Sequence, residues 1–398
     1  MNSVHRLSFK NNSKNENDFK GIECIIIFGA FKNNQIIHFL REIIVIFFMA
    51  SKPTELIGQT IINRFIIRKH LGGGAFGDVY EAEDLQTQRI VALKFETGAA
   101  TNPQLPNEYK HYKTLEGMAN IPTTYGLFDY NKSRILAMDK MGPSLESLFK
   151  RCGRKFSLKT VLMIADQMLR IIEYVHSCGI LHRDIKPQNF LVGHGKLRNR
   201  VFLIDYGVST VYIDPRTHEH MMYTNNNGLV GTAYYVSINT HLGDQQSRRD
   251  DLESIAYVLI RFLRGNLPWQ GFKVKSVEER NEKITQMKIQ TSPDMLCAGL
   301  PKEFKTFIEV VRRMRFDETP RYHWVRQIFN SLFIKKGYVY DGLFDWDEEA
   351  SIHRPLPSVY LAHTAAKYQR GNERQIRSRK AQIVLPEPRK IFLFGWRH

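Results

Sequence analysis

The pattern of apolar positions changes from a strand-like to a helix-like period along the chain. Between residues 65 and 95, short apolar runs rich in β-branched residues flank a glycine-rich turn. Such runs, bounded by glycine, are typical of β-strands. From about Ser144 onward the apolar residues recur at helical spacing, as in the stripe Leu162, Ile164, Ala165, Met168, Leu169, Ile172 and Val175. The sequence therefore predicts a small β-rich part followed by a larger helical part.

Both ends of the chain differ in composition from the part between them. Residues 1–48 are rich in Ile, Phe, Asn and Lys, and polar residues such as Arg41 and Glu42 interrupt their apolar runs. These runs are therefore shorter than the roughly 20 apolar residues of a transmembrane helix. We expect translation to start at Met49, which makes residues 1–48 a mis-assigned N-terminal extension. Residues 348–398 are basic and polar, and a loosely packed tail is expected there.

The net charge narrows the choice of partners without deciding it. A formal charge of +17 favours acidic partners, such as nucleic acid, anionic lipid or phosphorylated protein. A solvated basic surface that only aids solubility explains the same charge equally well. The cysteines are scattered without a close pair, so neither a zinc site nor a disulfide framework is indicated, and a reducing compartment fits best.

The first candidate for chemistry is a glycine-rich turn with glycines at positions 72, 74 and 77, followed by Val79. Glycines let backbone N–H groups approach phosphate oxygens without interference from a Cβ atom. Alone, the turn also fits a structural loop or a dinucleotide-binding fold. In a dinucleotide fold the turn opens a helix, whereas here extended residues continue through 78–82. The context favours a phosphate-binding loop between two strands.

A lysine on the next predicted strand supplies a second part of a phosphate site. Lys94 ends the run 91–94, Val-Ala-Leu-Lys, and its ammonium is suited to hold the α- and β-phosphates of a nucleotide. Such a lysine needs an acidic partner, and Glu108 lies in the segment of helical character that follows. A lone strand lysine is usually just solvated, so this interpretation depends on the glycine turn before it.

The strongest motif is His-Arg-Asp-Ile-Lys-Pro-Gln-Asn at residues 182–189. Asp184 is suited to orient an attacking hydroxyl and accept its proton, and Lys186 to steady a transferring phosphoryl group. Asn189 offers an amide oxygen to Mg²⁺, and Asp205 offers a carboxylate directly after an apolar strand. Four such motifs in this order predict transfer of the γ-phosphoryl group of ATP. They argue against the alternative of a charged loop without chemistry.

The residues after these motifs resemble the casein kinase 1 family of eukaryotic protein serine/threonine kinases, over about residues 60–347. Most protein kinases close the activation segment with Ala-Pro-Glu, but residues 237–239 of this chain are Ser-Ile-Asn, as in that family. Further segments that match the family are 142–146, 240–243, 246–254, 267–271 and 344–346.

The resemblance implies an α+β, two-lobed protein kinase fold with a small β-rich N-lobe and a larger α-helical C-lobe. The N-lobe and hinge are expected over residues 49–141 and the C-lobe over 142–347, with Mg-ATP in the cleft between them. The expected catalytic residues are Asp184, Lys186, Lys94 and Glu108, and the expected magnesium ligands are Asn189 and Asp205. The residues expected to contact ATP are Leu71, Gly72, Gly73, Gly74, Ala75, Phe76, Gly77, Val79, Ala92, Lys94, Met138, Asp139, Met141, Leu191 and Ile204.

Within that set, Met138 corresponds to the gatekeeper, and the hinge over 139–141 is expected to pair its backbone with adenine. Asp251 is expected to brace the catalytic loop from a central helix. The family is usually active without phosphorylation of the activation loop. Gln188 and Tyr206 depart from the usual residues at supporting positions, and neither departure removes a catalytic group.

The family favours serine or threonine sites preceded by phosphoserine or acidic residues, which requires cations near the cleft to receive the anion. The family typically has an arginine where this chain has Tyr234. Arg183 is kept, and Arg280 stands where a basic residue is expected. We therefore expect weaker dependence on substrate priming than is usual for the family.

An active serine/threonine kinase is the expected function, because every phosphoryl-transfer group is present. The first alternative is a pseudokinase scaffold, a class that usually lacks one of those groups. The second is a nucleic-acid or membrane binder, but the sequence holds no nucleic-acid module or lipidation motif.

The expected partners are ATP and acidic or phosphorylated proteins, without nucleic acid or integral membrane association. A monomer in the cytoplasm, and also in the nucleus, is expected.

Overall fold

The computed structural model describes residues 56–74, 77–96, 104–131, 133–272 and 274–347. All elements discussed below belong to one unit of the chain, which begins at Thr60. The expected extension 1–48, the expected tail 348–398 and the loop residues Ala75 and Phe76 lie outside the described residues.

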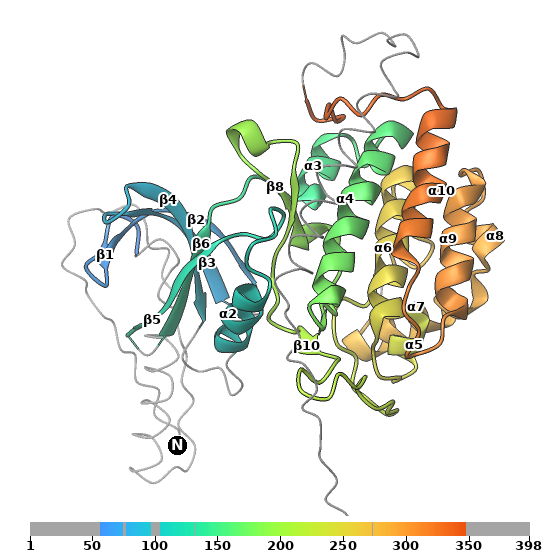
Figure 1. Cartoon of the computed structure of the whole chain (residues 1–398), viewed down its shortest axis with the longest axis horizontal. Coiled ribbons are helices and arrows are strands. Elements are labelled where there is room, and N and C mark those ends of the chain that lie inside the picture. Colours follow the sequence, from blue (N-terminus) through green and yellow to red (C-terminus); the bar gives the residue numbers. More distant parts are fainter. Residues whose placement is uncertain (1–55, 75–76, 97–103, 132, 273, 348–398) are drawn as a thin grey trace, which may run out of the picture. The chain divides into compact units, whose positions relative to one another are not determined.

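A six-stranded antiparallel sheet forms the N-terminal part of the described chain (Figure 1). Its strands are β1 (Thr60–Ile61), β2 (Phe65–Gly74), β3 (Gly77–Asp84), β4 (Arg89–Glu96), β5 (Thr124–Tyr130) and β6 (Ser133–Asp139). Their order in the sheet is β1-β2-β3-β4-β6-β5, and each neighbouring pair is antiparallel. Strands β2, β3 and β4 cover the β-branched runs on which the prediction of a β-rich part rested, so that prediction is confirmed.

One helix, α2 (Leu105–Thr114), packs against β5 and β6 of this sheet. Pro106 stands in its first turn, where the missing N–H is no loss. The backbone N–H groups of Gln104 and Leu105 both donate to one carboxylate oxygen of Glu96, at the end of β4. Glu96 thereby satisfies N–H groups that a helix start leaves unpaired, and it ties α2 to β4.

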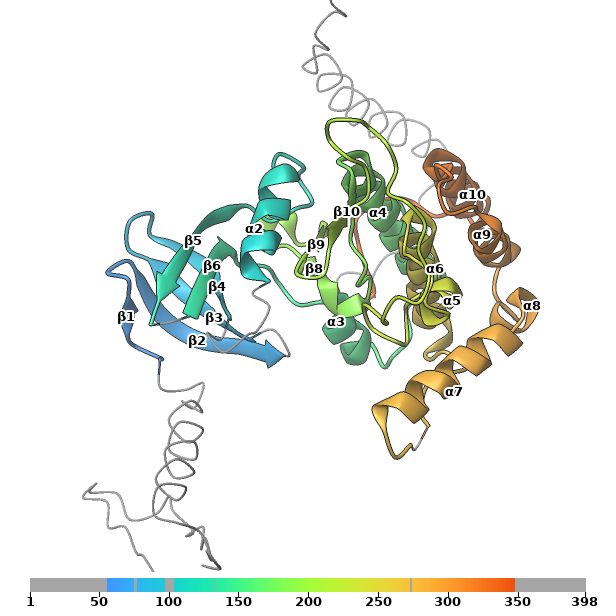
Figure 2. The same cartoon turned by 90° about the horizontal axis from the view of Figure 1, so that it is seen from below.

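The rest of the described chain is mainly helical (Figures 1 and 2). Its helices are α3 (Leu145–Arg151), α4 (Leu158–Ser177), α5 (Ile238–His241), α6 (Arg248–Arg264), α7 (Val277–Gln290), α8 (Pro293–Leu296), α9 (Lys302–Arg313) and α10 (Tyr322–Lys335). Its short elements are β7 (Ile180–Leu181), η1 (Pro187–Asn189), β8 (Phe190–Val192), η2 (Gly195–Leu197), β9 (Val201–Leu203) and β10 (Thr210–Val211). Among the described residues, no helix has both the length and the apolar character needed to cross a membrane.

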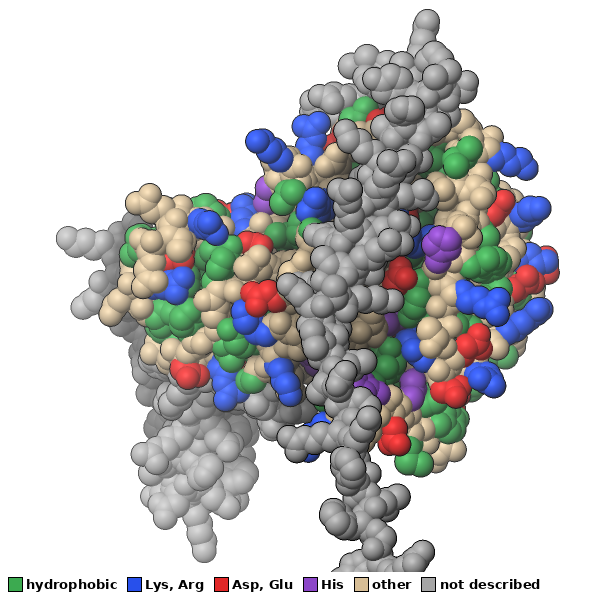
Figure 3. Space-filling model, in the orientation of Figure 1, with side chains coloured by type: hydrophobic (Ala, Val, Ile, Leu, Met, Phe, Trp, Pro, Cys, Tyr) green, Lys and Arg blue, Asp and Glu red, His purple; other side chains and the backbone are tan. Residues whose placement is uncertain are grey.

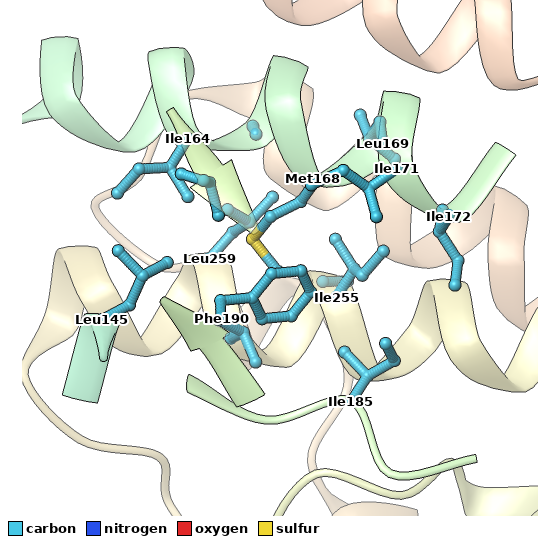
Figure 4. Close-up of a cluster of buried hydrophobic side chains, with 14 of the residues drawn as sticks. Leu145, Ile164, Met168, Leu169, Ile171, Ile172, Ile185, Phe190, Ile255 and Leu259 are labelled. Atoms are coloured by element: carbon cyan, nitrogen blue, oxygen red, sulfur yellow. The ribbon is translucent and has the colours of Figure 1, made fainter. Parts of the chain in front are cut away.

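Helices α4 and α6 form the centre of the hydrophobic core. Every residue of the predicted α4 stripe is buried, which confirms the helical period read from the sequence. Figure 4 shows Met168 of α4 pointing toward Phe190 of β8 and Leu259 of α6. Trp269, which follows α6, is fully buried. The core therefore gives the loops around β7 to β9 a rigid base.

Candidate active site

Three charged side chains from separate elements meet where the sheet adjoins the helical part. Lys94 lies in β4, Glu108 in α2, and Asp205 shortly after β9. The ammonium of Lys94 donates to Oε2 of Glu108 over 2.7 Å and to Oδ1 of Asp205 over 2.9 Å. The side chain of Glu108 is 1% exposed, so this pair is shielded from water. The structure thus contains the expected pair of Lys94 and Glu108. Asp205 is a second acidic partner of Lys94.

Two carboxylates sharing one ammonium have opposite pKa shifts. Burial raises the pKa of Glu108 to about 7 against the attraction of Lys94, and the charge of Asp205 raises it further. Burial acts in the same direction on Asp205, but the charge and hydrogen bond of Lys94 outweigh it and lower the pKa of Asp205. Burial alone lowers the pKa of Lys94, and the two carboxylates reverse this and raise it. Lys94 therefore stays charged, and Glu108 is the group that titrates near neutral pH.

Helix α2 contributes a second residue, Tyr112, one turn after Glu108 on the same face. Its hydroxyl accepts a hydrogen bond of 3.0 Å from the backbone N–H of Asp205. Its ring meets that of Tyr206 edge to face, with 5.0 Å between centroids. Tyr112 thus contacts two consecutive residues, the backbone N–H of Asp205 and the ring of Tyr206. Sequence reasoning missed this residue, because its role depends on a partner far along the chain.

The carboxylate of Asp184 is held at both of its oxygens. Lys186 donates to Oδ2 over 2.5 Å, and the hydroxyl of Thr232 donates to Oδ1 over 2.7 Å. The side-chain amide of Asn189 donates to the backbone carbonyl of Asp184 over 2.9 Å. Asp184, Lys186 and Asn189 therefore come together as the motif predicted, and Thr232 is an addition that only the fold makes visible.

The backbone of this loop is braced from α6 by Asp251, as expected. Its Oδ2 accepts from the N–H of His182 over 2.8 Å, and its Oδ1 accepts from the N–H of Arg183 over 2.9 Å. Arg183 takes a left-handed backbone conformation, with φ of 66°, which residues other than glycine rarely adopt. The ring of His176 also binds Asp251, over 2.9 Å. The hydrogen bonds to the buried carboxylate of Asp251 offset the free-energy cost of the left-handed conformation at Arg183.

Asn189 and Asp205, the expected magnesium ligands, lie on two segments joined by a backbone hydrogen bond. The N–H of Ile204 donates to the carbonyl of Asn189 over 2.9 Å. Because the amide nitrogen of Asn189 already donates to Asp184, its oxygen is the atom directed to other partners. A carboxylate and an amide oxygen are the hard ligands that Mg²⁺ takes in nucleotide sites. The residues present therefore fit the metal.

The glycine turn is a β-hairpin between β2 and β3, not the start of a helix. Gly73 pairs with Asp78, and Gly74 pairs with Gly77. A Cβ atom on Gly77 would stand 1.8 Å from the carbonyl oxygen of Phe95, so only glycine fits there. The dinucleotide-fold alternative requires a helix after this turn and is excluded.

The residues expected around adenine lie on β4, at the end of β6 and on β8. Ala92 and Met138 are cross-strand partners in β4 and β6, and both are buried. The N–H of Gly142 donates to the carbonyl of Val192 over 2.7 Å, which ties the segment after β6 to β8. Leu191 is thereby placed beside the hinge.

The other expected ATP contacts are distributed over the same surface. Val79 of β3 pairs across the sheet with Lys94. Leu71 is exposed near the end of β2, which suits a residue that covers a ligand. The side chain of Asp139 accepts from the N–H of Thr123 over 2.8 Å, and its backbone N–H donates to the carbonyl of Thr123 over 2.9 Å. Sequence reasoning missed one hinge feature, the 2.6 Å ion pair between Lys140 and Glu81 of β3.

A comparison with family models agrees with this geometry. The model of the protein kinase domain matches residues 65–334 of this chain. The chain belongs to the protein kinase family. The match begins at the first residue of β2 and runs to the last turn of α10, so it includes every element of the site described above.

Membership in this family confirms the expected fold class. The kinase has an N-terminal β-sheet and a helical C-terminal region, which is the two-lobed α+β arrangement. Protein kinases use ATP and a divalent metal ion to phosphorylate proteins, so ATP and a protein substrate are partners of this chain.

Proposed function

We propose that this protein kinase is an active serine/threonine kinase of the casein kinase 1 type. The observation that carries the proposal is the carboxylate of Asp184, held at both oxygens beside Lys186 and Thr232. The ion pair between Lys94 and Glu108 is also formed in this structure. A pseudokinase is expected to lack one of these groups.

The match to the casein kinase 1 motifs supports the subfamily. Ser237 of the Ser-Ile-Asn segment caps α5 by accepting from the N–H of Thr240 over 3.0 Å. Its own hydroxyl donates to Asp250 over 2.5 Å, in the motif 246–254 that also matches the family. Two segments that match the family thus bind each other in the fold.

In the proposed mechanism Asp184 receives the hydroxyl of the protein substrate, orients it and takes up its proton. Lys186, beside the same carboxylate, stabilises negative charge on the transferring phosphoryl group. Lys94 holds phosphate oxygens while Glu108 keeps its ammonium in place. Asn189 and Asp205 would hold Mg²⁺, which would supply positive charge at the phosphate oxygens. Catalysis of this kind depends on positioning and charge, because the transition state is loose.

The preferred substrates are proposed to be acidic proteins, with reduced dependence on a priming phosphate. Basic side chains outnumber acidic ones in the chain, and Figure 3 shows Lys and Arg spread among acidic side chains over the helical region. The guanidinium of Arg183, a candidate for receiving a phosphate, donates its Nε–H to the carbonyl of Val208 over 2.7 Å. Tyr234 provides no charge where the family has arginine. We propose a monomer that acts in the cytoplasm and the nucleus.

The test is transfer of labelled γ-phosphate from Mg-ATP to casein. Wild type is expected to label serine and threonine, and Asp184→Asn is expected to lose nearly all transfer while still binding ATP. The matched control is Asp129→Asn, an equal change at a side chain that is 94% exposed on β5 and expected to keep full activity. Binding of ATP without transfer by wild type would contradict the proposal and favour the scaffold alternative.

A further inference from the structure

A fully buried lysine lies beneath the segment that follows Thr232. Lys288, on α7, has no exposed surface. Its ammonium donates to the backbone carbonyls of Ala233 over 2.8 Å and Val236 over 2.5 Å. It also lies 3.2 Å from Nε2 of His241. None of the roles assigned to the active site uses this cation.

The surroundings of Lys288 act on the charge of its amine in opposite directions. Burial lowers its pKa well below the usual value, the negative charge of Glu253 opposes this shift, and the positive charge of Arg312 adds to it. The ammonium also lies 5.0 Å from the ring centre of Tyr257 and 5.3 Å from that of Trp269, both within cation–π range. Burial and the charge of Lys288 lower the pKa of His241 to about 3, so the imidazole next to it is neutral. The amine of Lys288 therefore stands among two carbonyls and two ring faces.

The residues that Lys288 holds are joined directly to the catalytic carboxylate. Thr232, whose hydroxyl donates to Asp184, immediately precedes Ala233. The N–H groups of Tyr235 and Val236 both donate to the carbonyl of Thr232, over 2.8 Å and 3.1 Å, which closes a compact turn. Any displacement of this turn therefore moves Thr232 relative to Asp184.

The same turn is held at a third carbonyl. The indole N–H of Trp269 donates to the carbonyl of Tyr234 over 2.8 Å. The carbonyls of Ala233, Tyr234 and Val236 are thus all bound by side chains from the helical region, and Lys288 binds two of the three. The side chains of Ala233 and Tyr234 remain partly exposed.

We propose that Lys288 is a positioning residue for the protein substrate. This inference rests on the proposed function. A polypeptide that brings a hydroxyl to Asp184 must lie against the turn next to Thr232, and Lys288 holds that turn from below without touching the substrate. Its loss removes the donor to the Val236 carbonyl, leaves the Ala233 carbonyl with the ring nitrogen of His241 at 3.0 Å, and loosens the surface on which the polypeptide binds. The ATP site is built from other elements.

The experiment compares steady-state kinetics of Lys288→Met with wild type, varying a peptide substrate and ATP separately. Methionine retains the apolar stem and removes the charge and its donors. The KM for peptide is expected to rise about ten-fold or more, as for loss of a charged hydrogen bond, while the KM for ATP stays within about two-fold. The matched control is Arg326→Met, which removes a cation from α10 that pairs with Asp166 of α4 over 3.1 Å. It is expected to lower stability without changing the KM for peptide.

A second readout follows the imidazole next to the lysine. In an NMR titration, the pKa of His241 is expected to rise in Lys288→Met, because the charge that lowers it is gone. A variant that retains a weaker, neutral donor, Lys288→Gln, is expected to give a peptide KM between those of wild type and Lys288→Met. If Lys288→Met does not fold, the Gln variant decides alone, and an unchanged peptide KM in it would overturn the inference.

Other outcomes separate this inference from the function on which it rests. If the KM for peptide and the KM for ATP rise equally and in proportion to the loss of melting temperature, the variant has a general packing defect. That outcome would overturn a positioning role. An unchanged peptide KM in folded Lys288→Met, with wild type active, would overturn this inference alone. Absence of transfer by wild type would overturn the proposed function, and the inference with it.

Discussion

The hydroxyl of Thr232 donates a 2.7 Å hydrogen bond to Oδ1 of Asp184, although 48 residues separate them. Because Lys186 binds Oδ2 of the same carboxylate, the orientation of Asp184 depends on one bond from its own loop and one from the activation segment. A displacement of the activation segment therefore changes the orientation of the Asp184 carboxylate directly.

We expect Thr232→Val to lower kcat about ten-fold or more, since it removes a hydrogen bond to a charged group, worth about 1.5–3 kcal/mol. The KM for ATP is expected to stay unchanged. Thr232→Ser keeps the hydroxyl and is expected to retain most of the activity. Steady-state phosphorylation assays measure both effects, and a Val variant as active as the Ser variant would contradict the assignment.

The activity is expected to depend on ionisation of Glu108. Since burial raises its pKa to about 7, the carboxylate that pairs with Lys94 is formed above that pH and is lost as the pH falls through it. The kcat/KM for ATP, measured from pH 6 to 8.5, is expected to rise through about pH 7. Glu108→Gln is expected to be weakly active at every pH and to lack this step. A wild-type profile that is flat over the range would contradict the expectation.

Acid stability is expected to depend on Asp84, at the end of β3. The hydrogen bond from Arg64 lowers the pKa of Asp84 from 3.8 to about 2. For a lowered carboxyl pKa, the stabilisation is complete above the unfolded value and disappears as the pH falls from 3.8 toward 2. Urea unfolding over this window should show a steeper fall in the free energy of unfolding for wild type than for Asp84→Asn. The exposed control Asp129→Asn should behave as wild type does, and three parallel curves would contradict the prediction.

Tyr234→Arg is expected to strengthen the preference for phosphorylated substrates. A cation at this position can receive a phosphate, and a hydrogen bond to a charged group is worth about 1.5–3 kcal/mol. The ratio of kcat/KM for a phosphoserine-primed peptide to that for its unprimed form should rise about ten-fold. Tyr234→Phe removes the hydroxyl without adding charge and should leave this ratio as in wild type. An unchanged ratio in the Arg variant would place the anion site elsewhere.

The prediction from sequence was strongest where chemistry is carried by a short segment. Asp184, Lys186 and Asn189 lie within six consecutive positions, so their motif could be recognised before any fold was known. Residues that act from a distance were missed. Tyr112 binds the backbone of Asp205 from 93 positions away, and nothing near Tyr112 in the sequence signals that partner.

The sequence by itself determined the order of β-rich and helical parts, the stripe of α4 and the identity of the charged groups. Periodicity and motifs depend on neighbours a few positions apart, which is why they can be read along the chain. Only the tertiary structure decided that Lys94 binds Asp205 across 111 positions and that Lys288 lies under Ala233 across 55. Whether a charged group is solvated or buried among partners depends on which distant segments pack together, and that is a property of the folded core.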